Sequence, residues 1–262
     1  MIQGQEINKI IATTQKAVDK YTYPVFTDKN NKPDLIASCL ILEVESKYYL
    51  VTASHVVKNI NTTFVIGVEG NLLPITGEFI CSNSFQDKSS VGNFDIAYIE
   101  LDSELISKNK IIPLGQNKLI MFDRQNSPPI AFIHGFPNSR NKQKKALWNT
   151  QKFKLKAYAY AGIIDINFKD WDKYNKRKDN HTCMSYRATS TNNIPTHPRG
   201  ISGGGLWIVP NILEPNNYFL DSILIEYYDR DKIVFATKVS KVIVFIKKTL
   251  LCREDENIID IS

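Results

Sequence analysis

The sequence has little that would join it covalently or carry it into a membrane. It contains only four cysteines in 262 residues, and none of them forms a C-x-x-C pair. This spacing excludes a disulfide-rich scaffold or a zinc ribbon. No long charge-free apolar run is present, which excludes a membrane-spanning helix and argues against a membrane partner. The amino terminus, Met1 to Glu6, lacks the basic start and apolar core of an export signal, so we expect a cytoplasmic protein with reduced cysteines.

What the sequence does have is the composition of an ordinary globular protein. Apolar residues make up 43% and aromatic residues 11% of the chain, and a chain of this length buries roughly three quarters of its unfolded surface without needing a crosslink. The net charge is +6, with basic residues gathered at 138–145 and 173–178. Such patches can bind nucleic acid. Because no stacking-aromatic motif or zinc-finger spacing accompanies them, we interpret them as solvated loops and expect no nucleic-acid partner.

One serine lies among four glycines, in the segment Gly200-Ile201-Ser202-Gly203-Gly204-Gly205, and an apolar run follows it at once. Glycine permits turn angles that a Cβ forbids, so the N–H groups of Gly200 and Ser202 can converge beside the Ser202 hydroxyl. This layout indicates a nucleophile, Ser202, with an oxyanion hole formed by Gly200 and Ser202.

A serine nucleophile needs a base and a carboxylate that orients the base. His55 ends the block Thr52-Ala53-Ser54-His55, and Asp95 opens the apolar block that begins Asp95-Ile96-Ala97. Asp87 and Asp102 are rival orienting groups, but neither opens an apolar strand. The remaining histidines show no H-x-x-x-H spacing, so we interpret them as structural and expect no metal site; they are His134, His181 and His197.

The three blocks T-A-x-H, D-I-A-x-x-x-L and G-x-S-G-G, in this order, resemble those of the chymotrypsin-like serine peptidases. In style they are closest to the bacterial single-chain HtrA-like branch. The resemblance implies an all-β fold of two six-stranded antiparallel β-barrels, with His55 and Asp95 on the first and Ser202 on the second. It also implies a catalytic triad that needs no cofactor.

The expected organisation follows from these blocks and from the apolar patterns between them. We expect an N-terminal helix at 5–20 and a lead-in within residues 1–34, a first barrel over 35–122, and a second barrel over 123–262 with a C-terminal helix from about residue 239. The helix at 5–20 is expected to dock on its own chain, and docking on a partner is the alternative. The strands expected from the pattern cover 35–44, 48–52, 63–68, 73–81, 95–101, 130–137, 152–161, 163–168, 182–188, 206–209, 222–228 and 233–236.

Two positions depart from the secreted members of this family. Ile201 replaces the aspartate that pairs with a newly cut amino terminus, so we expect no activation by clipping. Thr196 replaces the acid that selects Lys and Arg, and it predicts an uncharged residue before the scissile bond. Glu226 lies on the strand expected to line the same substrate pocket and offers an alternative site for a basic side chain. Whether the oxyanion loop is formed constitutively or awaits an activating protein partner stays open.

The sequence thus predicts a serine endopeptidase that cleaves protein or peptide substrates through an acyl-enzyme. Two alternatives stay open, a catalytically silent or partner-activated binding module with the same fold, and an esterase using the same chemistry. The α/β-hydrolases place their triad in the order Ser, Asp, His. The order His55, Asp95, Ser202 does not match them.

Overall fold

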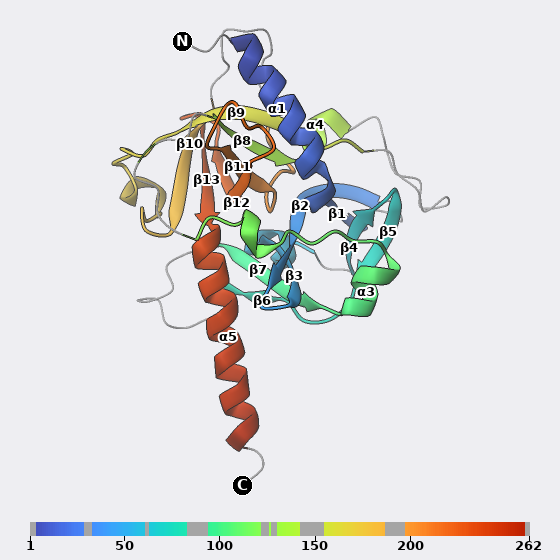
Figure 1. Cartoon of the computed structure of the whole chain (residues 1–262). Helices are drawn as coiled ribbons and strands as arrows, with labels where there is room; N and C mark the ends of the chain where they lie inside the picture. The colour runs from blue at the N-terminus through green and yellow to red at the C-terminus, as the bar shows by residue number, and fades with distance from the viewer. Residues whose placement is uncertain are drawn as a thin grey trace.

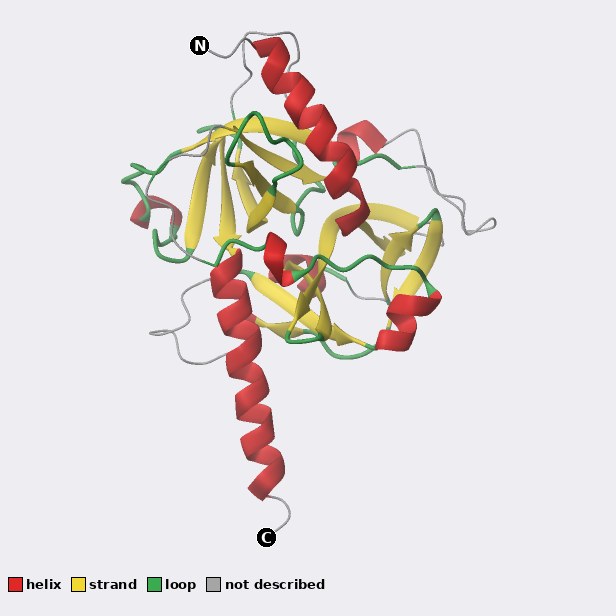
Figure 2. Ribbon diagram, viewed as in Figure 1, coloured by secondary structure: helices red, strands yellow, loops and turns green. Residues whose placement is uncertain are grey.

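The structure, a computed structural model, describes residues 4–28, 33–60, 63–82, 94–121, 126, 130–141, 155–186 and 197–259. Its described strands form two units, a seven-stranded sheet and a closed six-stranded barrel. In Figures 1 and 2 the barrel lies above the sheet, helix α1 crosses the outside of the barrel, and helix α5 runs down past the sheet.

The first unit is an antiparallel sheet in the order β5-β4-β1-β2-β3-β7-β6. Its central strand β2 is buried throughout residues 37–42, where the sequence is a continuous run of small and apolar side chains. A strand covered on both faces needs such a run rather than an alternating pattern. The strands are β1 (Thr22–Asp28), β2 (Pro33–Val44), β3 (Lys47–Ala53), β4 (Phe64–Val68), β5 (Asn71–Ile75), β6 (Ile80–Cys81) and β7 (Ile96–Leu101).

Strand β1 lies inside the segment 1–34, which the sequence predicts as a helix and lead-in. It pairs with β2 from Thr22↔Leu40 to Asp28↔Pro33 and also with β4. Pro24 and the polar residues that follow weaken its strand pattern, yet the side chains of Val25 and Phe26 are buried. Besides β1, the first unit differs from the expected pattern at 73–81, where two strands, β5 and β6, replace the single strand expected. The described sheet therefore has seven strands rather than six, with β5 at one edge and β6 at the other.

The second unit is the predicted six-stranded barrel, closed in the order β10-β13-β12-β11-β8-β9. Apolar side chains from its strands fill the interior, among them Ile133, Met184, Leu206, Leu224 and Ala236. The strands are β8 (Ile130–Gly135), β9 (Tyr158–Ile164), β10 (His181–Ser185), β11 (Gly205–Val209), β12 (Phe219–Tyr228) and β13 (Ile233–Lys238).

The helices lie outside the two units. The α-helices are α1 (Gly4–Val18), α2 (Ser54–Lys58), α3 (Ser103–Lys108), α4 (Asn138–Asn141) and α5 (Val239–Ile259), and short 3-10 turns cover Asp19–Tyr21, Gln116–Lys118 and Asp172–Tyr174. Helix α1 docks on its own chain, as predicted, because Thr14 Oγ1 donates to the Pro215 carbonyl (2.9 Å) and Gln15 Nε2 donates to the Ala157 carbonyl (3.0 Å). None of the described helices is both long and apolar enough to span a bilayer.

Candidate active site

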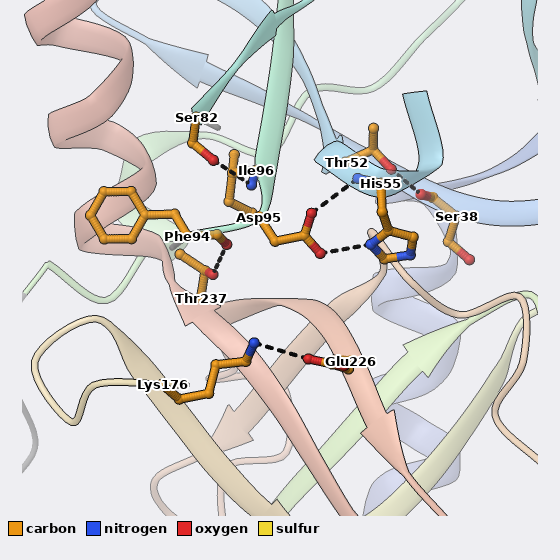
Figure 3. Close-up of polar contacts among 10 residues, drawn as sticks. All are labelled: Ser38, Thr52, His55, Ser82, Phe94, Asp95, Ile96, Lys176, Glu226 and Thr237. Carbon is orange, nitrogen blue, oxygen red and sulfur yellow. Dashed lines mark hydrogen bonds and ion pairs between the residues drawn. The ribbon is translucent and has the colours of Figure 1, made fainter. Parts of the chain in front are cut away.

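His55 and Asp95 meet because β3 and β7 are neighbours, with Ala53 opposite Ile96. His55 Nδ1 lies 2.6 Å from Asp95 Oδ2, and the His55 backbone N–H donates to Asp95 Oδ1 at 3.0 Å. Figure 3 shows the carboxylate directed at the ring in this way. An ionised carboxylate only accepts hydrogen bonds, so Nδ1 carries the ring proton and Nε2 is left as the basic nitrogen.

The two side chains differ in their exposure to solvent. The His55 side chain is 44% exposed, whereas that of Asp95 is 17% exposed. The carboxylate is therefore the more shielded of the two groups, and the imidazole side chain is partly open to solvent. This arrangement suits a base that exchanges protons with a substrate while a fixed group holds it.

The backbone around Asp95 is held by contacts from both units. Asp95 itself has φ +50°, and the Ile96 N–H donates to Ser82 Oγ at 3.0 Å. From β13 of the barrel, Thr237 Oγ1 donates to the Phe94 carbonyl at 2.5 Å, as Figure 3 shows. Sequence reasoning missed Thr237, and its local sequence carries no signal for this contact.

The loop that carries Ser202 rests directly on the first sheet. The Ser38 N–H donates to the Ser202 carbonyl at 2.9 Å, and Thr52 Oγ1 donates to the Ser38 carbonyl at 2.9 Å. Gly203 has φ +82°, and a Cβ there would lie 2.1 Å from the Ser38 carbonyl oxygen. These contacts bring the Ser202 loop close to Thr52, which lies near the end of β3 and three residues before His55. Within the described residues, no hydrogen bond joins the Ser202 hydroxyl to the His55 ring.

The peptide between Arg199 and Gly200 has a defined orientation. The Arg199 carbonyl accepts from the Asn138 N–H at 2.8 Å. Because the peptide bond is trans, its N–H at Gly200 points away from Asn138. In the described part of the chain, the N–H groups of Gly200 and Ser202 donate no hydrogen bond. Both donors are thus available to an oxyanion, although the oxyanion hole itself stays a prediction.

Ile201, between these two donors, is 4% exposed and packs with the interior residues of the barrel. Burying an isoleucine side chain contributes roughly 2–3 kcal/mol. This apolar contact anchors the Ser202 loop. In members of the resembled family that are activated by clipping, an ion pair holds the same loop instead.

The two predicted pocket residues have different outcomes. Thr196 lies outside the described residues. Glu226 lies on β12, and its carboxylate is 2.9 Å from Lys176 Nζ, whose side chain is only 6% exposed. Figure 3 shows this pair pointing at each other and lying apart from His55 and Asp95. The structure therefore does not bring Glu226 into contact with the base, and its charge is already paired.

Among the described strands, none pairs with one edge of β12 beside the Ser202 loop. Strand β11 pairs with β12 only as far as Gly205↔Ile223, and the Gly203 N–H then donates to the Leu224 carbonyl at 2.7 Å. Beyond Leu224, no described strand pairs with this edge of residues 225–228. An unpaired strand edge offers backbone donors and acceptors to an extended peptide.

The histidines interpreted as structural have partners within the fold. His134 and His181 are buried, and the His197 ring packs edge-on against Tyr227 with 5.4 Å between ring centroids. Among the described residues, no group of three His, Cys, Asp or Glu side chains could hold a metal ion.

Comparisons with known proteins show similarity at the level of fold. No family model matches the sequence, and no curated protein sequence matches it. The inactivated protease paralogue S-I1 of the scabies mite is 16% identical with a TM-score of 0.54, covering 90% of this chain and 96% of its own. The serine protease domain of the Sesbania mosaic virus polyprotein is 13% identical with a TM-score of 0.50, covering 86% and 91%.

A third similar structure concerns the coupled folding and binding of the Sesbania mosaic virus VPg protein. It is 12% identical to this chain with a TM-score of 0.50, and the match covers 87% of this chain and 90% of the other. The fold is therefore that of the chymotrypsin-like serine proteases, as the sequence predicts. None of the three is described as HtrA-like, so that branch stays a prediction.

Proposed function

We propose that this chain is a serine endopeptidase that acts through Ser202, His55 and Asp95. The observation that carries the proposal is the double contact between Asp95 and His55, at 2.6 Å to the ring and 3.0 Å to the backbone. A merely structural histidine needs no such fixed tautomer with an open second nitrogen. Here the carboxylate fixes the proton on Nδ1 and leaves Nε2 as the basic nitrogen of a side chain that is 44% exposed.

The chemistry follows from these positions. Ser202 Oγ attacks the scissile carbonyl carbon while His55 Nε2 accepts the hydroxyl proton, and Asp95 stabilises the imidazolium that forms. The carbonyl oxygen becomes an oxyanion, which the N–H groups of Gly200 and Ser202 bind. His55 then gives its proton to the leaving amine, and water releases the acyl group from Ser202 by the reverse of the same steps.

The edge of β12 with which no described strand pairs supports a peptide substrate. Residues 225–228 lie just beyond the hydrogen bond that ties Gly203 to Leu224, so a chain added to this edge runs past Ser202. Pairing through the backbone binds an extended segment whatever its sequence, which suits cleavage within a chain. An activating protein partner is a further proposal, because contacts from both units shape the site and a bound protein can bias them.

The test is labelling of the full-length protein with a fluorophosphonate, which reacts with an activated serine. We expect one adduct on Ser202, with an intact mass showing no backbone cleavage. Ser202→Ala should abolish labelling, and His55→Ala should lower its rate by a factor on the order of 10⁶. Ser103→Ala, at the exposed start of α3, is the matched control.

A catalytically silent binding protein is the second candidate. It is favoured by the missing hydrogen bond between Ser202 and His55 and by the similar fold of a mite protein described as inactivated. Hydrogen bonds of this kind are often long before substrate binds, so labelling decides between the two candidates. If neither the wild type nor the wild type mixed with cell extract labels at Ser202, the peptidase proposal is wrong.

A further inference from the structure

The segment between α1 and β1 is tied to a buried histidine of the barrel. His134, on β8, has a side chain with no exposed surface, and its Nε2 lies 2.8 Å from Asp19 Oδ1. Its Nδ1 lies 2.9 Å from Thr22 Oγ1. Because the carboxylate can only accept, Nε2 carries the proton and the Thr22 hydroxyl serves Nδ1. Both ring nitrogens thus depend on the residues that follow α1.

The residues after His134 form the support of the Ser202 loop. A Cβ added to Gly204 would lie 2.3 Å from the His134 carbonyl oxygen, and one added to Gly135 would lie 3.2 Å from the Ile201 Cα. The Phe136 N–H donates to Ser38 Oγ at 2.9 Å, and this hydroxyl donates to the Gly200 carbonyl at 3.1 Å. Movement of β8 at this end therefore moves the oxyanion loop.

We infer that Asp19 and His134 are positioning residues for the oxyanion loop, so that docking of α1 sets the reactivity of Ser202. This inference rests on the proposed function. Neither side chain touches the reacting atoms. They act through the backbone of residues 134–136, which lies against Gly200, Ile201 and Gly204.

The contact between Asp19 and His134 can be broken from the Asp19 side, because the two side chains differ in their exposure to solvent. The Asp19 side chain is 48% exposed, whereas that of His134 is fully buried. If α1 lifts from the barrel, Asp19 returns to water but the His134 Nε2–H is left without its acceptor inside the protein. A buried donor without a partner is costly, so the end of β8 shifts to satisfy it. A partner that lifts α1 would therefore lower the reactivity of Ser202.

The test compares Asp19→Ala with Asp19→Asn in the full-length chain. The alanine removes the acceptor, whereas the amide oxygen of asparagine still accepts from Nε2. Asp19→Ala should slow fluorophosphonate labelling about tenfold, less than the 10²–10³-fold cost of losing a whole oxyanion donor. Asp19→Asn should restore the rate to within about twofold of the wild type. Glu45→Gln is the matched control. It removes the charge of an exposed residue in the β2–β3 turn that pairs with Lys247 of α5.

A second readout separates positioning from general loss of stability. In protein labelled with ¹⁵N at its 12 glycines, Asp19→Ala should move the amide resonances of Gly200 and Gly204 and leave that of Gly70, in the β4–β5 turn, in place. Gln15→Ala, which loosens α1 but keeps Asp19, should move Gly200 and Gly204 in the same direction. Gln15→Ala replaces Asp19→Ala in both measurements if Asp19→Ala does not fold.

The outcomes are separable from those of the proposed function. Wild-type labelling rates in Asp19→Ala and Gln15→Ala overturn the inference and leave the peptidase proposal intact. Slower labelling with unmoved Gly200 and Gly204 resonances also overturns it. If the wild type does not label at all, the peptidase proposal fails, and the glycine spectra alone then decide whether Asp19 positions the loop.

Discussion

Gly200→Ala tests the oxyanion hole with a single methyl group. Gly200 has φ +98°, and an added Cβ would lie 2.2 Å from Asn138 Oδ1 and 2.8 Å from the Phe136 carbonyl oxygen. The first neighbour is a side chain, but the second is backbone and cannot rotate away. A positive φ costs an alanine roughly 1–2 kcal/mol, and relief of the two contacts requires the loop to move away from β8.

That movement takes the Gly200 N–H away from the position of the oxyanion. Losing one such donor costs about 10²–10³-fold in turnover, or roughly 3–4 kcal/mol of transition-state stabilisation. We expect this loss in kcat for a peptide ester, with KM changed little, because the donor acts mainly in the transition state. Thermal unfolding, followed by circular dichroism, measures the accompanying loss of stability.

Gly115→Ala is the matched control. Gly115 has φ −69°, and its added Cβ would meet only Asn117 Oδ1, at 3.1 Å. Alanine fits this backbone, so stability should change by less than about 1 kcal/mol and turnover should not change. If Gly200→Ala keeps turnover within about twofold of the wild type while Gly115→Ala behaves as expected, Gly200 is not an oxyanion donor.

Two further predictions concern the substrate pocket and the buried thiols. Lys176 already pairs with Glu226, so we expect the protein to cut a peptide library after uncharged residues. If it instead cuts chiefly after Lys or Arg, and Glu226→Gln loses this cleavage, the predicted preference is wrong. Burial, followed by the charge of Asp165, raises the pKa of the Cys183 thiol to about 12. An unfolded thiol titrates near 8.5, so above about pH 9 the unfolded chain releases a proton that the folded chain keeps, and the free energy of unfolding falls as pH rises toward 12. Urea unfolding at about pH 8 and pH 10.5 should show a smaller fall in Cys183→Ala than in the wild type, and equal falls would contradict the assignment.

The parts of the fold that the sequence predicts are those with a local pattern. The apolar run of β2 and most of the barrel strands are predicted from a few adjacent residues, whereas the two strands expected at 152–161 and 163–168 are the single strand β9. The helix after β13 is also predicted, despite the β-branched residues at its start. The blocks around His55 and Asp95 likewise predict the ends of β3 and β7, and pairing of these strands brings the two side chains together.

The contacts that the sequence does not predict join residues far apart in the chain. Ser38 holds the Ser202 and Gly200 carbonyls, Thr237 holds Phe94, and Lys176 neutralises Glu226. Each depends on the register and packing of two elements, which a local pattern does not contain. Strand β1 was missed for a different reason, since the proline within it obscures a pattern that its pairing with β2 and β4 overrides.

Helix α5 bears on the order in which the protein becomes competent as it is made. It continues directly from β13 and packs on the first sheet, where Phe245 meets the Tyr98 ring edge-on at 5.5 Å and Thr249 Oγ1 bonds the Tyr98 hydroxyl. His55 and Asp95 leave the ribosome long before these residues. The contacts that α5 adds between the second unit and the first form only after this helix has emerged. If the chain is the peptidase proposed above, His55 and Asp95 are made well before Ser202 and α5, so the proposed site is completed only late in synthesis.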